Sequence, residues 1–106
     1  MPELTAQLVR SGVLKTSVLI GVFESIDRKD FVRPEYQSEA YGDYPLPIGE
    51  GQTISQPTTV AFMLELLQPS LGEKILDVGS GSGWTTALLA KAVGKTGQVI
   101  GLELVS

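Results

Sequence analysis

The sequence predicts an α/β fold, with helices in its amino-terminal half and one parallel strand–helix–strand unit in its carboxy-terminal half. Residues 74–78 and 98–105 are apolar runs of strand length, and a glycine-rich turn follows the first of them. Residues 85–93, between the two runs, are rich in Ala and Leu, as expected of a helix. Two apolar strands joined by such a crossover form a right-handed parallel unit.

Composition predicts one small folded domain and excludes several functions. The 106 residues are 42% hydrophobic and 19% charged, and their net charge of −4 with no basic band argues against a nucleic-acid partner. No apolar run approaches the roughly 20 residues of a membrane span, and no signal peptide is visible, so we expect a cytoplasmic protein without a membrane partner. The chain has no Cys and no His, so we expect no disulfide, no thiolate chemistry and no metal site.

Two helices are predicted before residue 30. The first covers residues 2–13, with Pro2 in its first turn and Gly12 at its end. Ser17 is expected to cap the second helix. The apolar stripe of that helix comprises Val18, Leu19, Val22, Phe23 and Ile26, and the polar residues outside it are Glu24, Arg28 and Lys29.

Residues 30–56 show neither helical nor strand periodicity and hold all three tyrosines. We predict a long ordered loop that wraps the domain or lines a pocket, because loops of this length are more often functional than not. Ser55 is then expected to cap a helix that has Pro57 in its first turn and stops at Pro69. Its apolar stripe comprises Val60, Met63, Leu64 and Leu67.

The turn in KILDVGSGSGWTT, residues 74–86, places three glycines where a strand ends and a helix begins. Backbone N–H groups are free at such a place and the helix dipole is positive, so a ligand can approach closely. A dinucleotide-binding turn has the spacing G-x-G-x-x-G, whereas Trp84 stands three positions after Gly81, which disfavours a pyrophosphate. Glu103, at the end of the second strand, can accept hydrogen bonds from both hydroxyls of a ribose. The turn and this acid together predict an adenosine site.

Structural alternatives remain open from the residues alone. The glycines could serve tight packing, Asp77 could be a turn or capping residue, and Glu103 could be a solvated acid at a strand end. Ser55 could do no more than cap its helix.

Two motifs resemble one enzyme family. LDVGSGSG, residues 76–83, resembles the first cofactor motif of S-adenosylmethionine-dependent methyltransferases, and YPLPIGEGQTISQP, residues 44–57, resembles the signature of the protein-L-isoaspartate O-methyltransferases. The preceding RKDFVRPEYQSEA also fits, so the resemblance runs from about residue 10 to the end. It implies a Rossmann-like fold, truncated here, with residues 1–56 as a helical cap and substrate-side loop and residues 57–106 as a partial cofactor-binding unit.

The resemblance also implies site residues. Ser55 matches the family's active-site serine, the glycine turn would pass under the methionine part of S-adenosylmethionine, and Glu103 would hold its ribose. The implied cofactor-binding residues are Gln52, Thr53, Ile54, Ser55, Asp77, Gly79, Ser80, Gly81, Gly83 and Glu103. Asp77 would stand near the cofactor's amino group or support the turn. Residues 58–60 are Thr, Thr and Val, where some relatives place a histidine.

The implied reaction transfers a methyl group to the carboxylate of isoaspartyl residues in damaged proteins, which is a repair reaction with S-adenosylhomocysteine as product. That carboxylate, with a pKa near ~4, is ionised at neutral pH, and a sulfonium methyl donor is already activated. Catalysis then needs alignment and exclusion of water rather than a strong base, so a site without His or Cys suffices.

Family members continue for roughly as many residues again. We therefore expect apolar residues of the two strands to be poorly covered, namely Ile75, Val78, Ile100 and Leu102. We expect a homo-oligomer or a fragment of a longer protein, with impaired activity. Two other functions stay open: a non-catalytic module that binds a copy of itself or another partner, and a fragment of a dinucleotide-dependent oxidoreductase.

Overall fold

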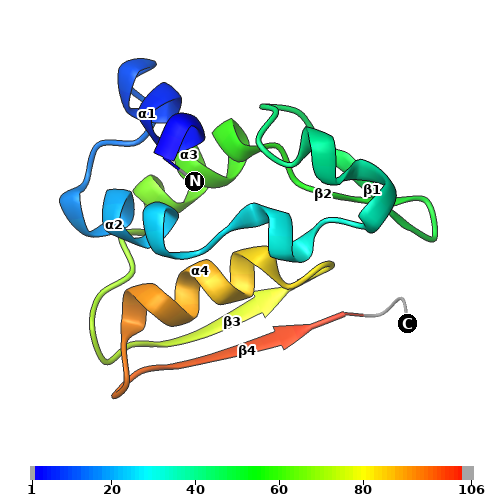
Figure 1. Ribbon diagram of the computed structural model, residues 1–106. Helices are drawn as coiled ribbons and strands as arrows, with labels where there is room; N and C mark the ends of the chain where they lie inside the picture. Colours follow the sequence, from blue (N-terminus) through cyan, green and yellow to red (C-terminus); the bar gives the residue numbers. More distant parts are fainter. Residues whose placement is uncertain (1, 104–106) are drawn as a thin grey trace.

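The computed structural model describes residues 2–103. Its carboxy-terminal part is the predicted unit: strand β3 (Lys74–Val78), helix α4 (Trp84–Val93) and strand β4 (Gln98–Leu102). The two strands pair in parallel, in register from Lys74 opposite Gln98 to Val78 opposite Leu102. The parallel unit is thus confirmed, and α4 lies along one face of its sheet (Figure 1). Strand β4 ends at Leu102, and the predicted extension to residue 105 lies partly outside the described residues.

Helices α1 (Pro2–Arg10) and α2 (Ser17–Ser25) form where helices were expected, although α1 is shorter than predicted. The cap assigned to Ser17 is wrong, because Ser17 is the first helical residue and Thr16 holds the N-cap position. The carboxylate of Glu65 accepts hydrogen bonds from the backbone N–H groups of Lys15 (2.6 Å) and Thr16 (2.7 Å). A side chain from another helix therefore binds the two residues that lead into α2.

Residues 30–56, predicted as one long ordered loop, contain more regular structure than expected. Residues 28–54 form two 3₁₀ helices, η1 (Arg28–Phe31) and η2 (Pro34–Glu39), and an antiparallel hairpin of β1 (Leu46–Gly49) and β2 (Gln52–Ile54). Gly49, Glu50 and Gly51 all have positive φ, a conformation that glycine adopts without steric cost. This tight Gly-Glu-Gly turn makes the hairpin possible in a segment without strand periodicity.

Helix α3 (Pro57–Leu67) begins with Pro57 as expected, but Ser55 is not its cap. Gln56 holds the N-cap position without a side-chain hydrogen bond, and Asp43 supplies the acceptor instead. Its carboxylate accepts from the Thr58 N–H (2.9 Å) and from the Thr58 hydroxyl (2.5 Å). The predicted stripe is half right, because Val60 and Leu64 are buried while Met63 and Leu67 are exposed.

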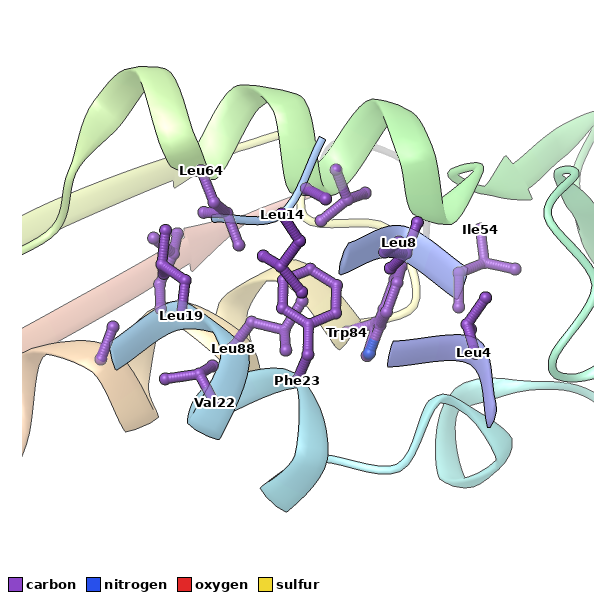
Figure 2. Close-up of a cluster of buried hydrophobic side chains, with 14 of the residues drawn as sticks. Leu4, Leu8, Leu14, Leu19, Val22, Phe23, Ile54, Leu64, Trp84 and Leu88 are labelled. Atoms are coloured by element: carbon purple, nitrogen blue, oxygen red, sulfur yellow. The ribbon is translucent and has the colours of Figure 1, made fainter. Parts of the chain in front are cut away.

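The core lies between α4 and the amino-terminal helices (Figure 2). The ring of Trp84, at the start of α4, meets the ring of Phe23 from α2 edge to face at 6.0 Å. Leucines from α1, α2 and α4 close around this pair, as Figure 2 shows for Leu8, Leu19 and Leu88. Helix α4 is thus buried on two sides, by α2 and by the sheet.

The other face of the β3–β4 sheet is bare. Leu76 (57% exposed), Val78 (74%), Ile100 (49%) and Leu102 (48%) point away from α4. The expected exposure of Val78, Ile100 and Leu102 is confirmed. The expectation is wrong for Ile75. Side chains alternate between the two faces of a strand, so that of Ile75 lies on the α4 side and packs against the core.

Candidate functional site

A cleft of about 400 Å³ opens where η1, the β1–β2 hairpin and the glycine turn after β3 meet. It is lined by Asp30, Phe31, Val32, Arg33, Ile48, Gly49, Glu50, Gln52, Gly81, Ser82 and Glu103. Three predicted site residues, Gln52, Gly81 and Glu103, are brought together here from different elements. The lining residues of η1 and β1 belong to the segment 30–56 that was expected to wrap the domain or line a pocket, but Phe31 and Ile48 were not singled out, since nothing local marks them.

The glycine turn is held by its own N–H groups. Those of Gly79 (2.7 Å) and Ser80 (3.0 Å) both donate to the Leu102 carbonyl, and that of Gly83 donates to the Ser80 carbonyl (3.0 Å). The expectation of free donors at this turn is therefore wrong for these residues, because the turn continues the pairing of β3 with β4 for two more residues. A ligand can approach the main chain closely at this turn because the glycines have no side chains. The N–H groups of Gly79, Ser80 and Gly83 are, however, already used within the chain.

Glu103 folds over the same turn. Its Oε2 accepts a hydrogen bond from the Gly81 N–H at 2.6 Å. A β-carbon at Gly81 would lie 3.5 Å from Ile48 Cδ1 and 3.8 Å from Glu103 Oε2, and the φ of +55° disfavours any side chain there. The strand-end acid, the turn and the hairpin thus enclose one small space.

Asp77 supports this arrangement from inside the sheet. Its Oδ2 accepts a hydrogen bond from the Thr86 hydroxyl of α4 at 2.7 Å. On the neighbouring strand, a β-carbon at Gly101 would lie 3.0 Å from Thr86 Oγ1 and 3.1 Å from Ser80. Sequence reasoning missed both Thr86 and Gly101, whose packing depends on how α4 lies across the strands.

The remaining predicted residues on the substrate side lie apart. Thr53 and Ser55 are exposed, outside the cleft lining, and the Ile54 side chain is buried in the core. The Ser55 carbonyl accepts a hydrogen bond from Arg28 Nη2 at 3.2 Å. Gly83 closes the turn near Phe31, whose Cε1 would lie 4.0 Å from a β-carbon there.

Arg28 was predicted to lie outside the apolar stripe, but its side chain is fully buried. Burial lowers the pKa of Arg28 to about 10, and electrostatic attraction to Asp43 and Tyr44 opposes that shift, so the guanidinium stays charged at neutral pH. No periodicity reveals such a residue, since the groups that bind it are main-chain carbonyls far along the chain.

Across residues 2–103, no helix is both long and apolar enough to pass through a bilayer. Over the same residues, acidic side chains do not gather in a group of three or more that could hold a metal ion.

The family model described as protein-L-isoaspartate(D-aspartate) O-methyltransferase (PCMT) matches residues 1–106. Two similar relatives are protein-L-isoaspartate O-methyltransferases. The one from Aeropyrum pernix is 48% identical over 101 residues, covering 95% of this chain and 39% of the relative. The one from Anaeromyxobacter dehalogenans is 50% identical over 97 residues, covering 92% of this chain and 46% of the relative.

A solved structure agrees with these matches. It is a Plasmodium falciparum protein described as a protein-L-isoaspartate O-methyltransferase, in complex with S-adenosyl-L-homocysteine; it superposes with a TM-score of 0.87 at 32% identity, over 97% of this chain and 48% of that one. The chain therefore spans about half the length of the relatives it matches or less. Sequence and fold lead to the same assignment, and the chain belongs to the protein-L-isoaspartate(D-aspartate) O-methyltransferase family.

Proposed function

We propose that these residues supply the cofactor-binding side and part of the substrate-binding side of a methyltransferase that acts on isoaspartyl carboxylates in damaged proteins. In this proposal residues 1–56 form the substrate-side part and residues 57–106 the part that holds S-adenosylmethionine. Membership of the family and the S-adenosyl-L-homocysteine bound to the similar Plasmodium falciparum structure support it.

The observation that carries the proposal is the position of Glu103. Its carboxylate accepts a hydrogen bond from the Gly81 N–H and borders a cleft that Gln52 also lines. Two carboxylate oxygens together offer roughly four acceptor positions, so a carboxylate held beside the turn suits the hydroxyls of a ribose.

The polarity of the cleft favours a sulfonium over a pyrophosphate. Its ionisable lining residues are three acids, Asp30, Glu50 and Glu103, and one base, Arg33. Four N–H groups of the turn, those of Gly79, Ser80, Gly81 and Gly83, already donate within the chain. A cationic ligand is attracted by this lining, whereas a dinucleotide would meet repulsion and few donors. This argues against the oxidoreductase alternative.

The residues needed for methyl transfer are few. When bound, S-adenosylmethionine supplies a methyl group that is already activated, and the substrate carboxylate is already ionised. In our proposal Ser55, two residues before α3, orients that carboxylate through its hydroxyl, while Gln52 and Thr53 border the approach. Ile54, anchored in the core, fixes the strand that carries them. What these residues contribute is alignment and exclusion of water.

The cofactor proposal is tested by titrating S-adenosylhomocysteine into the chain by calorimetry. Because the chain spans less than half the length of these relatives, we expect weak binding of S-adenosylhomocysteine and little methyl transfer. Glu103→Gln keeps the shape but loses the charge, so we expect about tenfold weaker binding, whereas Glu24→Gln, on an exposed face of α2, should bind as the parent does. No heat at millimolar ligand, or equal affinity of parent and Glu103→Gln, would refute the proposal.

The role of Ser55 is tested separately with an isoaspartyl peptide and radiolabelled S-adenosylmethionine. Ser55→Ala should lower turnover while leaving the affinity for S-adenosylhomocysteine unchanged. Equal turnover of parent and variant would remove Ser55 from the mechanism.

The bare sheet face supports a second proposal, that two copies of the chain associate through it. Four neighbouring apolar side chains are exposed there, between 48% and 74%. Ile100→Lys should shift sedimentation toward the monomer, whereas Val18→Lys, an exposed apolar position on α2, should not. A parent chain that stays monomeric over a wide concentration range would contradict this proposal.

A further inference from the structure

The Arg28 guanidinium gathers carbonyl groups from segments far apart in the sequence. Its Nη1 donates to the carbonyls of Ala40 (2.9 Å) and Gly42 (3.1 Å). Its Nη2 donates to the carbonyls of Tyr44 (3.0 Å) and Ser55 (3.2 Å). One side chain of η1 therefore joins the segment leading into β1 to the segment leading into α3.

The same guanidinium also contacts the cofactor side of the molecule. Its Cζ lies 5.4 Å from the centroid of the Trp84 ring, within the range of a cation–π interaction. Trp84 is the first residue of α4 and follows directly on Gly83, the last glycine of the turn. Arg28 thus sits between the Ser55 segment and the end of the glycine turn.

A buried charge is tolerated only with good partners, and these carbonyls provide them. The planar fork of arginine carries donors in fixed directions, so it can bind all four carbonyls at once beside the indole ring. A lysine keeps the charge but has one nitrogen, which cannot reach both pairs of carbonyls. The geometry therefore depends on the guanidinium and not on charge alone.

We propose that Arg28 is a positioning residue for methyl transfer, which fixes the Ser55 segment relative to the glycine turn without touching substrate or cofactor. This inference rests on the proposed function for its meaning in catalysis. The hairpin and the first turn of α3 are the parts whose placement it controls.

The test compares Arg28→Lys with Arg10→Lys, the same exchange at an exposed position of α1. Hydrogen exchange is followed in residues 40–46, 53–58 and 84–93. In Arg28→Lys we expect about tenfold faster exchange in the first two segments and less than about threefold in α4, because hydrogen bonds to a charged donor are lost only there. With isoaspartyl peptide, kcat should fall about tenfold while KM and the affinity for S-adenosylhomocysteine change less than about threefold.

The outcomes separate this inference from the proposed function. Unchanged exchange in Arg28→Lys, or equal acceleration in all three segments, would overturn the positioning role. A parent that neither binds S-adenosylhomocysteine nor methylates the peptide refutes the proposed function, and the exchange pattern still decides what Arg28 holds. If Arg28→Lys does not fold, NMR of the parent decides: resolved, slowly exchanging Nη protons of Arg28 are expected, and rapidly averaged signals would overturn the inference.

Discussion

We predict that Asp43 stabilises the start of α3. The sequence alone would assign this capping role to Ser55. The Asp43 carboxylate accepts hydrogen bonds from the N–H and the hydroxyl of Thr58, in the first turn of α3. Ser55 is exposed, and only its carbonyl takes part in a hydrogen bond that the structure defines. Asp43→Ala removes the acceptor of two hydrogen bonds, whereas Ser55→Ala removes none of the cap.

The expected magnitude follows from these two bonds. Loss of an N-cap side chain lowers the free energy of unfolding by about 0.5–2 kcal/mol, and a carboxylate bound to two donors belongs at the upper end, about 2 kcal/mol. For a domain of this size that corresponds to a fall in Tm of about 8–16 °C. Asp43→Asn keeps one acceptor oxygen without the charge, so it should lose about half as much. Ser55→Ala should stay within about 0.5 kcal/mol of the parent.

The assay is urea unfolding followed by circular dichroism at pH 7, with Tm measured on the same samples. Equal m-values among the variants would show that the compared states are the same. If Ser55→Ala proved more damaging than Asp43→Ala, the long-range cap would be refuted and the local cap restored.

Two further predictions concern α2 and β4. Burial raises the pKa of Glu65, but its hydrogen bonds at the start of α2 outweigh this effect and lower the pKa below the ordinary 4.5. The stability that this lowered pKa gives is present above pH 4.5 and lost as the pH falls further. The Tm difference between parent and Glu65→Gln should therefore narrow below that pH in thermal scans, and a difference that stays constant would refute the role of these hydrogen bonds. A β-carbon at Gly97 would lie 2.5 Å from Val93 Cβ, so Gly97→Ala should lower the free energy of unfolding, measured in urea, by about 1–3 kcal/mol. Gly21→Ala, in a helix with open space around it, should raise that free energy by about 0.5–1 kcal/mol. If both variants changed the free energy of unfolding in the same direction, the close contact between Gly97 and Val93 would be contradicted.

The parallel unit was predictable because its signals are local. The runs at 74–78 and 98–105 are apolar and of strand length, the segment between them favours helix, and handedness rules leave one arrangement. The meeting of Glu103 with Gly81 follows from the same topology, since the carboxyl ends of parallel strands lie at one edge of the sheet. Prediction succeeded where neighbours in sequence decide the structure.

The predictions of the helix caps and of the loop were wrong because residues far apart in the sequence decide these features. Ser17 and Ser55 are capping residue types close to helix starts, yet Thr16 and Gln56 hold the N-cap positions. Asp43 binds the first turn of α3 from a distance, and Glu65 binds the two residues that precede α2. A cap requires an acceptor near the N–H groups, and any element can bring one once the chain is folded. Likewise the segments on either side of the hairpin are joined by the buried Arg28, a residue that periodicity places outside the apolar stripe.

The glycine turn lies where the sequence predicted it, but its N–H groups were wrongly expected to be free. Its N–H groups were expected to be free because a strand-to-helix turn normally leaves them so, but Gly79 and Ser80 donate to the Leu102 carbonyl and Gly81 donates to Glu103. The acid that would hold a ribose is thus itself held by the turn, and the two form one unit. A side chain at Gly81 would strain a φ of +55° and would contact Glu103. The glycine spacing and the strand-end acid therefore constrain each other, which is why neither alone would define this cleft.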